Sequence, residues 1–487
     1  MKLKLEDIKG MKVLIMGLGL NGGGLESARF FAEKGADVLV TDIKDEVHLS
    51  SSVASLSHFK NIHFHLGFHD RSDFRDADLV IKNPGVKREG NEYLSVAKWI
   101  ESDVAVFASL SPSPIIAVTG TKGKSFTSTA IHYCLSRLGV QAFLAGNLGV
   151  SPLRYLESVK TDTPCVMELS SWQLADLKNC EDFHPHIAVV TPIMKDHQNW
   201  YGNMESYVKD KSIIYQRQEK NDFLLLNRDD VWSSRMAKDA RAKVCWYTKK
   251  AECGVEEKER YAYIDEAGRG ILLCEGTERV LLTKDSVKVK GIEARQNLLN
   301  AALVAYLMGF DVNCIREVVE DFEGIEHRME CFLQTKNNIT FYNDSAATIP
   351  EASCVAISAF LDSSSSKAKA VKNTAESENS SCHPIWIGGG TDKLLDFSPL
   401  AKVVKNAKKI FLLKGSATEK MLKIFDAEQI DYYGPYEDLE VLLAELKREV
   451  RAGDNVVFSP ASASFELFKN EFDRGNTFKR LVQEMFC

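Results

Sequence analysis

Short apolar segments alternate with amphipathic ones along most of the chain. Near the start, the runs Lys12–Met16, Asp37–Thr41 and Leu79–Lys82 have the length and composition of buried strands. A helical spacing of apolar residues follows the first run and continues to about Lys34. Strands that alternate with helices in this way predict βαβ units and therefore a parallel sheet.

The same alternation resumes after Ser109–Pro114, a segment rich in Ser and Pro. Helices are expected at Phe126–Leu138, Met204–Gln218 and Ile292–Phe310. The expected strands are Ile115–Val118, Gln141–Leu144, Thr163–Leu169, His186–Thr191, Phe223–Asn227, Val244–Thr248, Tyr261–Ile264, Ile271–Cys274 and Val280–Thr283. This pattern predicts a second α/β unit.

A third series of strands and helices begins near residue 326. Strands are expected at Thr340–Ser345, Pro384–Ile387, Lys409–Leu413 and Asn455–Ser459, and helices at Glu437–Arg451 and Ser464–Asn470. Within it, Asp362–Cys382 is polar and contains seven serines. That composition is typical of a flexible surface insertion.

The length of the chain agrees with several domains. Its 487 residues correspond to about three domains of about 150 residues each. We place the boundaries near residues 110 and 325, which gives predicted domains 1–110, 111–325 and 326–487. The predicted fold class is α/β throughout.

Composition and charge narrow the class of protein. Hydrophobic residues make up 45% and charged residues 26%, as in soluble globular proteins. A net charge of -7 argues against a general nucleic-acid binder. The start, MKLKLEDIKG, lacks the apolar core of a signal peptide, and no run of about 18 apolar residues indicates a membrane span. The eleven cysteines form no CxxC pair, so we expect reduced thiols and a cytoplasmic enzyme.

A glycine-rich turn joins strand to helix within IIAVTGTKGKSFTST, residues 115–129. Its glycines let the backbone approach anionic oxygens, and the N–H groups of the helix start point at them. Lys124 would reach the outer phosphates of a nucleotide, and the Ser125 hydroxyl suits Mg²⁺. Val118 stands where the Walker spacing has its first glycine, so a plain glycine-rich turn with a surface lysine is the alternative. We predict a nucleoside triphosphate site.

Two further motifs lie at the ends of predicted strands in the first domain. GLGLNG, residues 17–22, follows the first strand, and Asp42 ends the second. This arrangement matches a dinucleotide-binding fingerprint and equally fits another nucleotide-like ligand. Asn83-Pro-Gly85 follows the third strand, at the edge where such sheets bind ligands.

The order of motifs along the whole chain resembles the Mur ligase family. The motifs are GLGLNG, NPG, GTKGKS, GNLG, ELSSWQL, KDH, a helical lysine, NLLNAA, HRME, NDSAAT, GGGTDK and SPASASF. The resemblance implies a Rossmann-like N-terminal domain, a P-loop ATPase-like central domain with a mainly parallel sheet, and a Rossmann-like C-terminal domain. It also implies an ATP-dependent ligase of cytoplasmic peptidoglycan precursor synthesis, which joins D-glutamate to UDP-N-acetylmuramoyl-L-alanine through an acyl phosphate. We expect a monomer that uses no NAD.

The chemistry explains why a ligase needs the residues at the phosphate loop. Bringing a carboxylate to a triphosphate gathers several negative charges, which metal ions and fixed cations must offset. Glu168 ends a predicted strand beside the loop and could ligate Mg²⁺ together with Ser125. A buried helix-capping carboxylate is an equal reading of Glu168 from the sequence alone.

The resemblance assigns the remaining catalytic and ATP-binding residues. His197 and Lys211 would by themselves be read as structural or solvated, but the resemblance implies that His197 helps bind a second Mg²⁺ and that Lys211 is carbamylated. Alignment on Tyr207 and Tyr215 selects Lys211 over its neighbour Lys209. The ATP-binding set becomes Gly120, Thr121, Lys122, Gly123, Lys124, Ser125, Phe126, Asn297, Arg328 and Asp344. Arg328 and Asp344 could alternatively form a plain ion pair.

The two other substrates take the remaining assignments. The UDP-sugar set implied by the resemblance is Gly19, Leu20, Asn21, Asp42, Asn83, Gly85, Asn147, Ser170 and Gln173. The amino-acid set is Thr348, Lys393, Ser464 and Phe472.

Four positions depart from the family pattern: Phe126 replaces a Thr, Gln296 a His, Ala346 a Lys and Ile349 an Asn. Two alternatives stay open. One is a folylpolyglutamate synthase, although such chains have the phosphate loop near their start and about 110 residues precede it in this chain. The other is a non-catalytic nucleotide-binding regulator.

Overall fold

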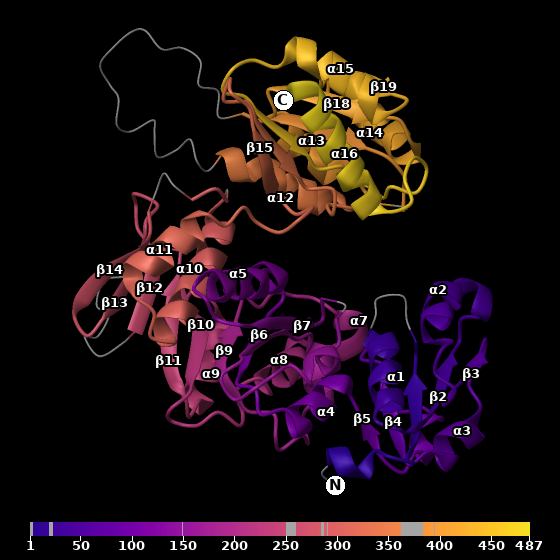
Figure 1. The fold of residues 1–487 in the computed structure, drawn as a ribbon. Helices are drawn as coiled ribbons and strands as arrows, with labels where there is room; N and C mark the ends of the chain where they lie inside the picture. Colours follow the sequence, from indigo (N-terminus) through magenta and orange to yellow (C-terminus); the bar gives the residue numbers. More distant parts are fainter. Residues whose placement is uncertain are drawn as a thin grey trace. The chain divides into compact units, whose positions relative to one another are not determined.

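The computed structural model describes residues 3–18, 23–148, 150–249, 260–283, 287–289, 291–361, 383–393 and 395–487. The chain divides into two compact units (Figure 1). The first unit comprises Met1–Tyr263, Ile271–Leu281 and Asn297–Arg316, and the second comprises Ile264–Gly270, Leu282–Gln296 and Glu317–Cys487. In the described part of the chain, no helix combines the length and the apolar character needed to cross a bilayer.

The first unit begins with a five-stranded parallel sheet in the order β3-β2-β1-β4-β5. The strands are β1 (Lys12–Met16), β2 (Asp37–Asp42), β3 (Ile62–Leu66), β4 (Leu79–Lys82) and β5 (Ile100–Glu101). The helices are η1 (Leu5–Asp7), α1 (Gly23–Glu33), α2 (Glu46–Leu56), α3 (Arg71–Asp76), η2 (Leu94–Val96) and α4 (Asp103–Leu110). Successive side chains of β1 enter different cores: Val13 and Ile15 pack on one face, and Leu14 and Met16 on the other. Both faces are therefore covered, as in doubly wound sheets.

A nine-stranded sheet follows, in the order β14-β13-β12-β11-β10-β9-β6-β8-β7. Its strands are β6 (Ile115–Thr119), β7 (Phe143–Gly146), β8 (Cys165–Glu168), β9 (Pro185–Val190), β10 (Phe223–Asn227), β11 (Lys243–Thr248), β12 (Arg260–Ile264), β13 (Gly270–Cys274) and β14 (Thr277–Leu282). The helices are α5 (Lys124–Arg137), η3 (Pro152–Tyr155), α6 (Ser171–Asp176), α7 (Gln198–Tyr201), α8 (Met204–Ser212), α9 (Val231–Asp239), α10 (Ile292–Leu307) and α11 (Val312–Glu320). The parallel strands β6, β7 and β8 end side by side, with Glu168 between Val118 and Gly146.

The second unit contains a six-stranded sheet in the order β15-β16-β20-β17-β18-β19. Its strands are β15 (Glu330–Gln334), β16 (Thr340–Asn343), β17 (Ile385–Gly389), β18 (Lys409–Leu413), β19 (Tyr433–Tyr436) and β20 (Asn455–Phe458). The helices are α12 (Pro350–Leu361), α13 (Ser398–Val404), α14 (Ser416–Ala427), α15 (Leu439–Glu449) and α16 (Glu471–Phe486). One core joins the sheet to α15 and α16, and another joins it to α12, α13 and α14. The edge strand β15 runs antiparallel to β16, whereas β16, β20, β17, β18 and β19 pair with one another in parallel.

The α/β class and the parallel sheets confirm the prediction, and most strands match to within two residues. The predicted helix Ser464–Asn470 is wrong: this segment consists of turns, and α16 begins only after Asn470, whose side chain caps it by accepting from Asp473 N–H. The predicted helix Met204–Gln218 ends earlier, as α8. The strands β3, β5, β15 and β19 had no predicted counterpart. The predicted insertion Asp362–Cys382 lies outside the described residues, and the boundaries near 110 and 325 stay predictions.

Candidate active site

The phosphate loop has the backbone that its glycines permit. Gly120 has φ +138° and Gly123 φ +88°. A Cβ atom at Gly120 would lie 2.0 Å from Thr191 Oγ1, so this position needs glycine for space as well as for conformation. Gly123 is the N-cap of α5, whose first turn begins with Lys124 and Ser125. The N–H groups at the start of a helix point along its axis, and this end of α5 suits an anion.

Neighbouring loops hold the phosphate loop in place. Thr121 Oγ1 lies 3.1 Å from the Tyr207 hydroxyl and accepts from Met194 N–H at 3.0 Å. Lys124 Nζ donates to Thr121 O at 3.1 Å, while Lys122 is exposed and Phe126 half-buried. Asn297, on α10, packs against the loop: a Cβ at Gly123 would lie 2.8 Å from Asn297 Oδ1. The predicted ATP-binding residues of the first unit are thus brought together.

Glu168 has a carboxylate oxygen that lacks a partner. Its side chain is 1% exposed, and Oε1 accepts from Asn147 Nδ2 at 2.7 Å. Oε2 is buried without a hydrogen bond. An orphaned carboxylate oxygen beside a phosphate loop fits a Mg²⁺ ligand, because Mg²⁺ prefers oxygen and usually keeps phosphate and water ligands as well. Among the described residues, no group of three or more His, Cys, Asp or Glu side chains is arranged to hold a metal ion.

Lys211 is almost fully buried beneath the phosphate loop. Its Nζ donates to Gly120 O at 2.7 Å and lies 4.6 Å from the centre of the Tyr207 ring. Burial, and next the positive charge of Lys124, lower the pKa of Lys211 well below that of a free lysine. The physical consequence is a larger share of neutral, nucleophilic amine.

His197 lies in the loop between β9 and α7, and it is more exposed than Lys211. It has φ +50° and is the N-cap of α7, and its side chain is 41% exposed. Its ring lies 4.9 Å from that of Trp172 and 6.1 Å from that of Tyr207. The ring is therefore held by aromatic contacts, and His197 and Lys211 share Tyr207 as a neighbour.

A cavity of about 350 Å³ lies at the strand ends of the first unit. Five of the predicted UDP-sugar residues line it: Asn83, Gly85, Asn147, Ser170 and Gln173. Ser170 and Gln173 also form a capping box at the start of α6, so both have a structural task. The predicted residues Gly19, Leu20 and Asn21 lie outside the described residues.

Asp42 anchors backbone rather than presenting free oxygens. It is 6% exposed, Oδ2 accepts from Leu18 N–H at 3.0 Å, and Oδ1 accepts from Lys44 N–H at 2.9 Å. Asp42 therefore fixes the turn that enters the GLGLNG segment.

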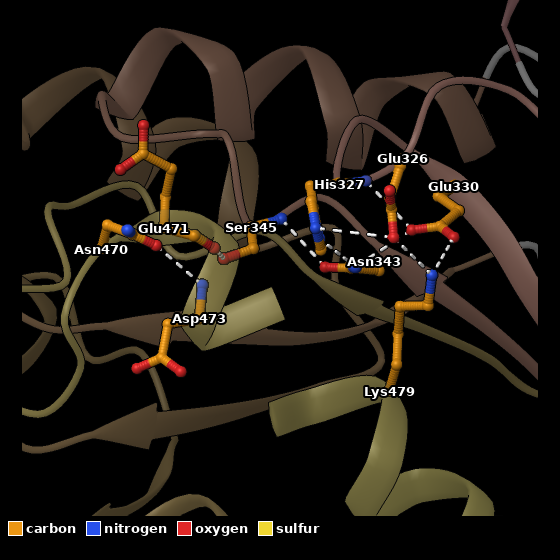
Figure 2. A network of polar contacts seen from close by, with 9 residues as sticks. All are labelled: Glu326, His327, Glu330, Asn343, Ser345, Asn470, Glu471, Asp473 and Lys479. Carbon is orange, nitrogen blue, oxygen red and sulfur yellow. Dashed lines mark hydrogen bonds and ion pairs between the residues drawn. The ribbon is translucent and has the colours of Figure 1, made fainter. Parts of the chain in front are cut away.

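In the second unit, a polar network surrounds the loop that carries Arg328 (Figure 2). His327 and Met329, on either side of the exposed Arg328, have φ +62° and +49°. Glu330 accepts from His327 N–H and from Asn343 Nδ2, and Lys479 reaches the same glutamate. Such left-handed residues persist where surrounding contacts fix them, so the network determines the backbone at Arg328.

Asp344 is buried at the end of β16, in the same network of loops. Its oxygens accept from Met329 N–H at 3.1 Å and from the Ser459 hydroxyl at 2.6 Å. Burial raises the pKa of Asp344 to about 7, although Ser459, Met329 and the charges of Arg328 and Arg474 act in the opposite direction.

The residues predicted to bind the amino-acid substrate differ in how exposed they are. Ser464 is 3% exposed and its hydroxyl has no partner, whereas Lys393 is exposed with Nζ 5.2 Å from the Phe465 ring centre. Phe472 is 55% exposed and its ring packs edge-on against His327. Thr348 is half-buried at the loop before α12. These residues, with Arg328 and Asp344, belong to the second unit, and the other assigned residues belong to the first.

Sequence reasoning missed three charged residues near these sites that are fully or largely buried. Lys82, which lines the cavity, forms an ion pair of 2.9 Å with Asp176, and burial raises the pKa of Asp176 to about 6. Arg474, 1% exposed, donates to the backbone oxygens of Ser345, Ser462 and Ala463. The sequence contained one signal for these residues, namely that Lys82 is a lysine at the end of an apolar strand.

Known proteins resemble this chain over its full length. Family models for the Mur ligase middle domain and for the MurD-like N-terminal domain match residues 118–306 and 11–106. UDP-N-acetylmuramoylalanine–D-glutamate ligase from Treponema pallidum is 38% identical, with 98% of each chain covered. That of Borreliella afzelii is 37% identical, with 99% of each covered. MurF from Acinetobacter baumannii has a similar fold, with a TM-score of 0.59 at 14% identity over 99% of this chain and 98% of that one.

Both relatives have the same name, and each is more than 30% identical to this chain over nearly its whole length. The N-terminal and middle domains also match their own family models. This chain therefore belongs to the Mur ligase family, in its MurD group.

Proposed function

We propose that the chain is an ATP-dependent ligase that adds D-glutamate to UDP-N-acetylmuramoyl-L-alanine, in the cytoplasmic synthesis of peptidoglycan precursors. The observation that carries this proposal is the partnerless Oε2 atom of buried Glu168 beside the phosphate loop. A loop for a triphosphate next to an unsatisfied hard oxygen is what a metal-assisted phosphoryl transfer needs. The names of the relatives supply the two substrates.

The first chemical task is to activate a carboxylate by phosphorylation. Lys124 and the N–H groups at the start of α5 would hold the phosphates of ATP, and Asn297 contacts the same loop. Ser125 and Glu168 would hold Mg²⁺, with His197 at a second ion. Such ions offset the charge of the phosphates as the γ-phosphoryl group moves to the carboxylate.

The second task falls to Lys211, which we propose is carbamylated. Reaction with CO₂ requires the neutral amine, and its lowered pKa favours that form. The product has an anionic oxygen in place of an ammonium, so it can ligate a cation.

The nucleotide-sugar substrate is assigned to the cavity of the first unit. Asn83, Gly85, Asn147, Ser170 and Gln173 offer amides, hydroxyls and backbone around about 350 Å³, which suits a polar sugar nucleotide. Asn147 also hydrogen-bonds Glu168, so one residue connects the cavity wall with the proposed metal ligand.

The second unit would supply the amino acid site and further nucleotide contacts. We assign Thr348, Lys393, Ser464 and Phe472 to D-glutamate, and Arg328 and Asp344 to ATP. The buried Ser464 hydroxyl without a partner supports a ligand there.

The deciding experiment measures phosphate release from ATP with UDP-N-acetylmuramoyl-L-alanine and each amino acid in turn, D-glutamate included. We expect release only when ATP, the nucleotide sugar and D-glutamate are all present. ATP binding without amino-acid-dependent release would identify a non-catalytic regulator. Release with a folate substrate would identify a folylpolyglutamate synthase.

A further inference from the structure

Lys82 has three polar contacts inside the protein, two hydrogen bonds and one ion pair. It ends β4, and its side chain is 3% exposed. Its Nζ donates to Asn83 O at 3.0 Å and to Val86 O at 2.8 Å, and lies 2.9 Å from Asp176 Oδ2. The lysine therefore contacts the turn after β4 through two hydrogen bonds and the end of α6 through an ion pair.

These two segments form two walls of the cavity. Asn83, Pro84 and Gly85, in the turn after β4, line one side. Ser170, Trp172 and Gln173, at the start of α6, line another. Since α6 is only the six residues Ser171–Asp176, a contact at Asp176 fixes the whole helix.

Stability alone gives a poor reason for this ion pair. Removing two charges from water costs several kcal/mol per ion, and a well-packed apolar pair at such a place is often as stable or more stable. A buried ion pair can instead determine geometry, because a misplaced partner leaves an unpaired charge.

We propose that Lys82 and Asp176 are positioning residues for the nucleotide-sugar substrate, because their ion pair fixes the two walls of the cavity at the separation that the ligand needs. This proposal rests on the assignment of the cavity to that substrate.

The test compares Lys82→Met and Asp176→Asn with Lys34→Met. Lys34→Met is the control. Lys34 forms an ion pair with Glu157 that likewise connects β1–β5 with the nine-stranded part of the chain, but this pair is not buried, since the Glu157 side chain is 70% exposed. Calorimetry with UDP-N-acetylmuramoyl-L-alanine, and separately with ATP, gives the dissociation constants. We expect each cavity variant to weaken sugar-nucleotide binding at least tenfold, to leave ATP binding within twofold, and to be non-additive when combined. Lys34→Met should bind both ligands normally.

A second variant covers the case in which a single substitution leaves an unpaired charge and prevents folding. Lys82→Met with Asp176→Leu removes both charges and should retain the thermal stability of the wild type but not its sugar-nucleotide affinity. Normal affinity in this double variant would overturn the proposal.

Hydrogen exchange separates failure of this proposal from failure of the proposed function. In the ligand-free protein, residues 83–86 and 170–174 should exchange faster in Lys82→Met than in wild type. Unchanged exchange at both segments would refute the positioning role, even if the wild type bound no nucleotide sugar at all.

Discussion

The Nζ atom of Lys211 donates a hydrogen bond to the backbone oxygen of Gly120, across 2.7 Å. Gly120 also packs closely on Thr191, since a Cβ atom at this position would lie 2.0 Å from Thr191 Oγ1. The amine is thus held under the phosphate loop, in a setting that disfavours its own charge.

The first prediction concerns the chemical state of Lys211. Lys211→Arg should abolish turnover although it keeps a positive charge, because an arginine cannot form a carbamate and its guanidinium would stay charged under the loop. Lys209→Arg is the matched control, since Lys209 is exposed on the same helix, α8, and should retain wild-type turnover. Carbon-13 NMR after exposure to labelled CO₂ should give a carbamate signal in the wild type and in Lys209→Arg. A signal that persists in Lys211→Arg would contradict the assignment.

The second prediction concerns the metal ligands. Glu168→Gln keeps the shape and an acceptor for Asn147 but removes the charge from the partnerless oxygen. We expect a loss in turnover of more than tenfold, or about 1.4 kcal/mol, and a higher Mg²⁺ requirement. Ser125→Ala should act in the same direction. The measurement is phosphate release against Mg²⁺ concentration, and a wild-type Mg²⁺ response in both variants would exclude the two residues as ligands.

The buried strands explain why so much of the fold could be predicted. Strands such as Ile115–Thr119, buried at every position, form continuous apolar runs that are visible in one sequence. The segment 464–470 misled because Phe465, Leu467 and Phe468 have nearly helical spacing. In the structure Phe465 and Leu467 are exposed, and the bridge between Thr391 and Ala463 holds the preceding backbone extended.

Only part of the candidate site could be predicted from the sequence. The phosphate loop and Glu168 lie at strand ends, which sequence order locates directly. The pair Lys82 and Asp176 joins residues far apart in the chain, and no local pattern connects them. Nor could the sequence indicate that Asp42 has both oxygens engaged by backbone N–H groups.

The third prediction uses two glycines at opposite ends of α5. Gly123 and Gly139 have nearly equal φ values, +88° and +86°, but a Cβ at Gly123 would meet Asn297 whereas one at Gly139 meets nothing within 4 Å. Both Gly→Ala variants should lose about 1 kcal/mol of stability from backbone strain. Only Gly123→Ala should also weaken ATP binding, which calorimetry can measure. Equal ATP affinity in the two variants would show that the contact with Asn297 does not matter for the nucleotide.

The fourth prediction follows from the raised pKa of Asp344. Because its pKa in the folded protein is about 7 against an ordinary 3.8, the folded state favours the protonated form. This contribution to stability is fully present below about pH 4 and is lost as the pH rises to about 7. Each pKa unit corresponds to about 1.4 kcal/mol. The unfolding temperature of Asp344→Asn should therefore rise relative to that of the wild type between pH 5 and pH 8. A constant difference across that range would mean that Asp344 does not titrate there.

The last prediction concerns the charge of the amino acid substrate. D-glutamate has two carboxylates, and each needs a cation or several donors once it leaves water. The chain has Ala346 where the family pattern has a lysine, so Lys393 should take a larger share of this task, helped by the hydroxyls of Thr348 and Ser464. Lys393 is exposed and its Nζ lies over the Phe465 ring, which leaves the side chain accessible to a ligand.

Lys393→Ala should raise the KM for D-glutamate by about tenfold to a hundredfold, since hydrogen bonds to charged groups contribute about 1.5–3 kcal/mol. The KM for ATP should change little. Ala346→Lys should keep activity and partly rescue Lys393→Ala, because it returns a cation to the loop after β16. A double-mutant cycle on the KM for D-glutamate measures the coupling. Strictly additive effects would show that residues 346 and 393 do not share the charge of the substrate.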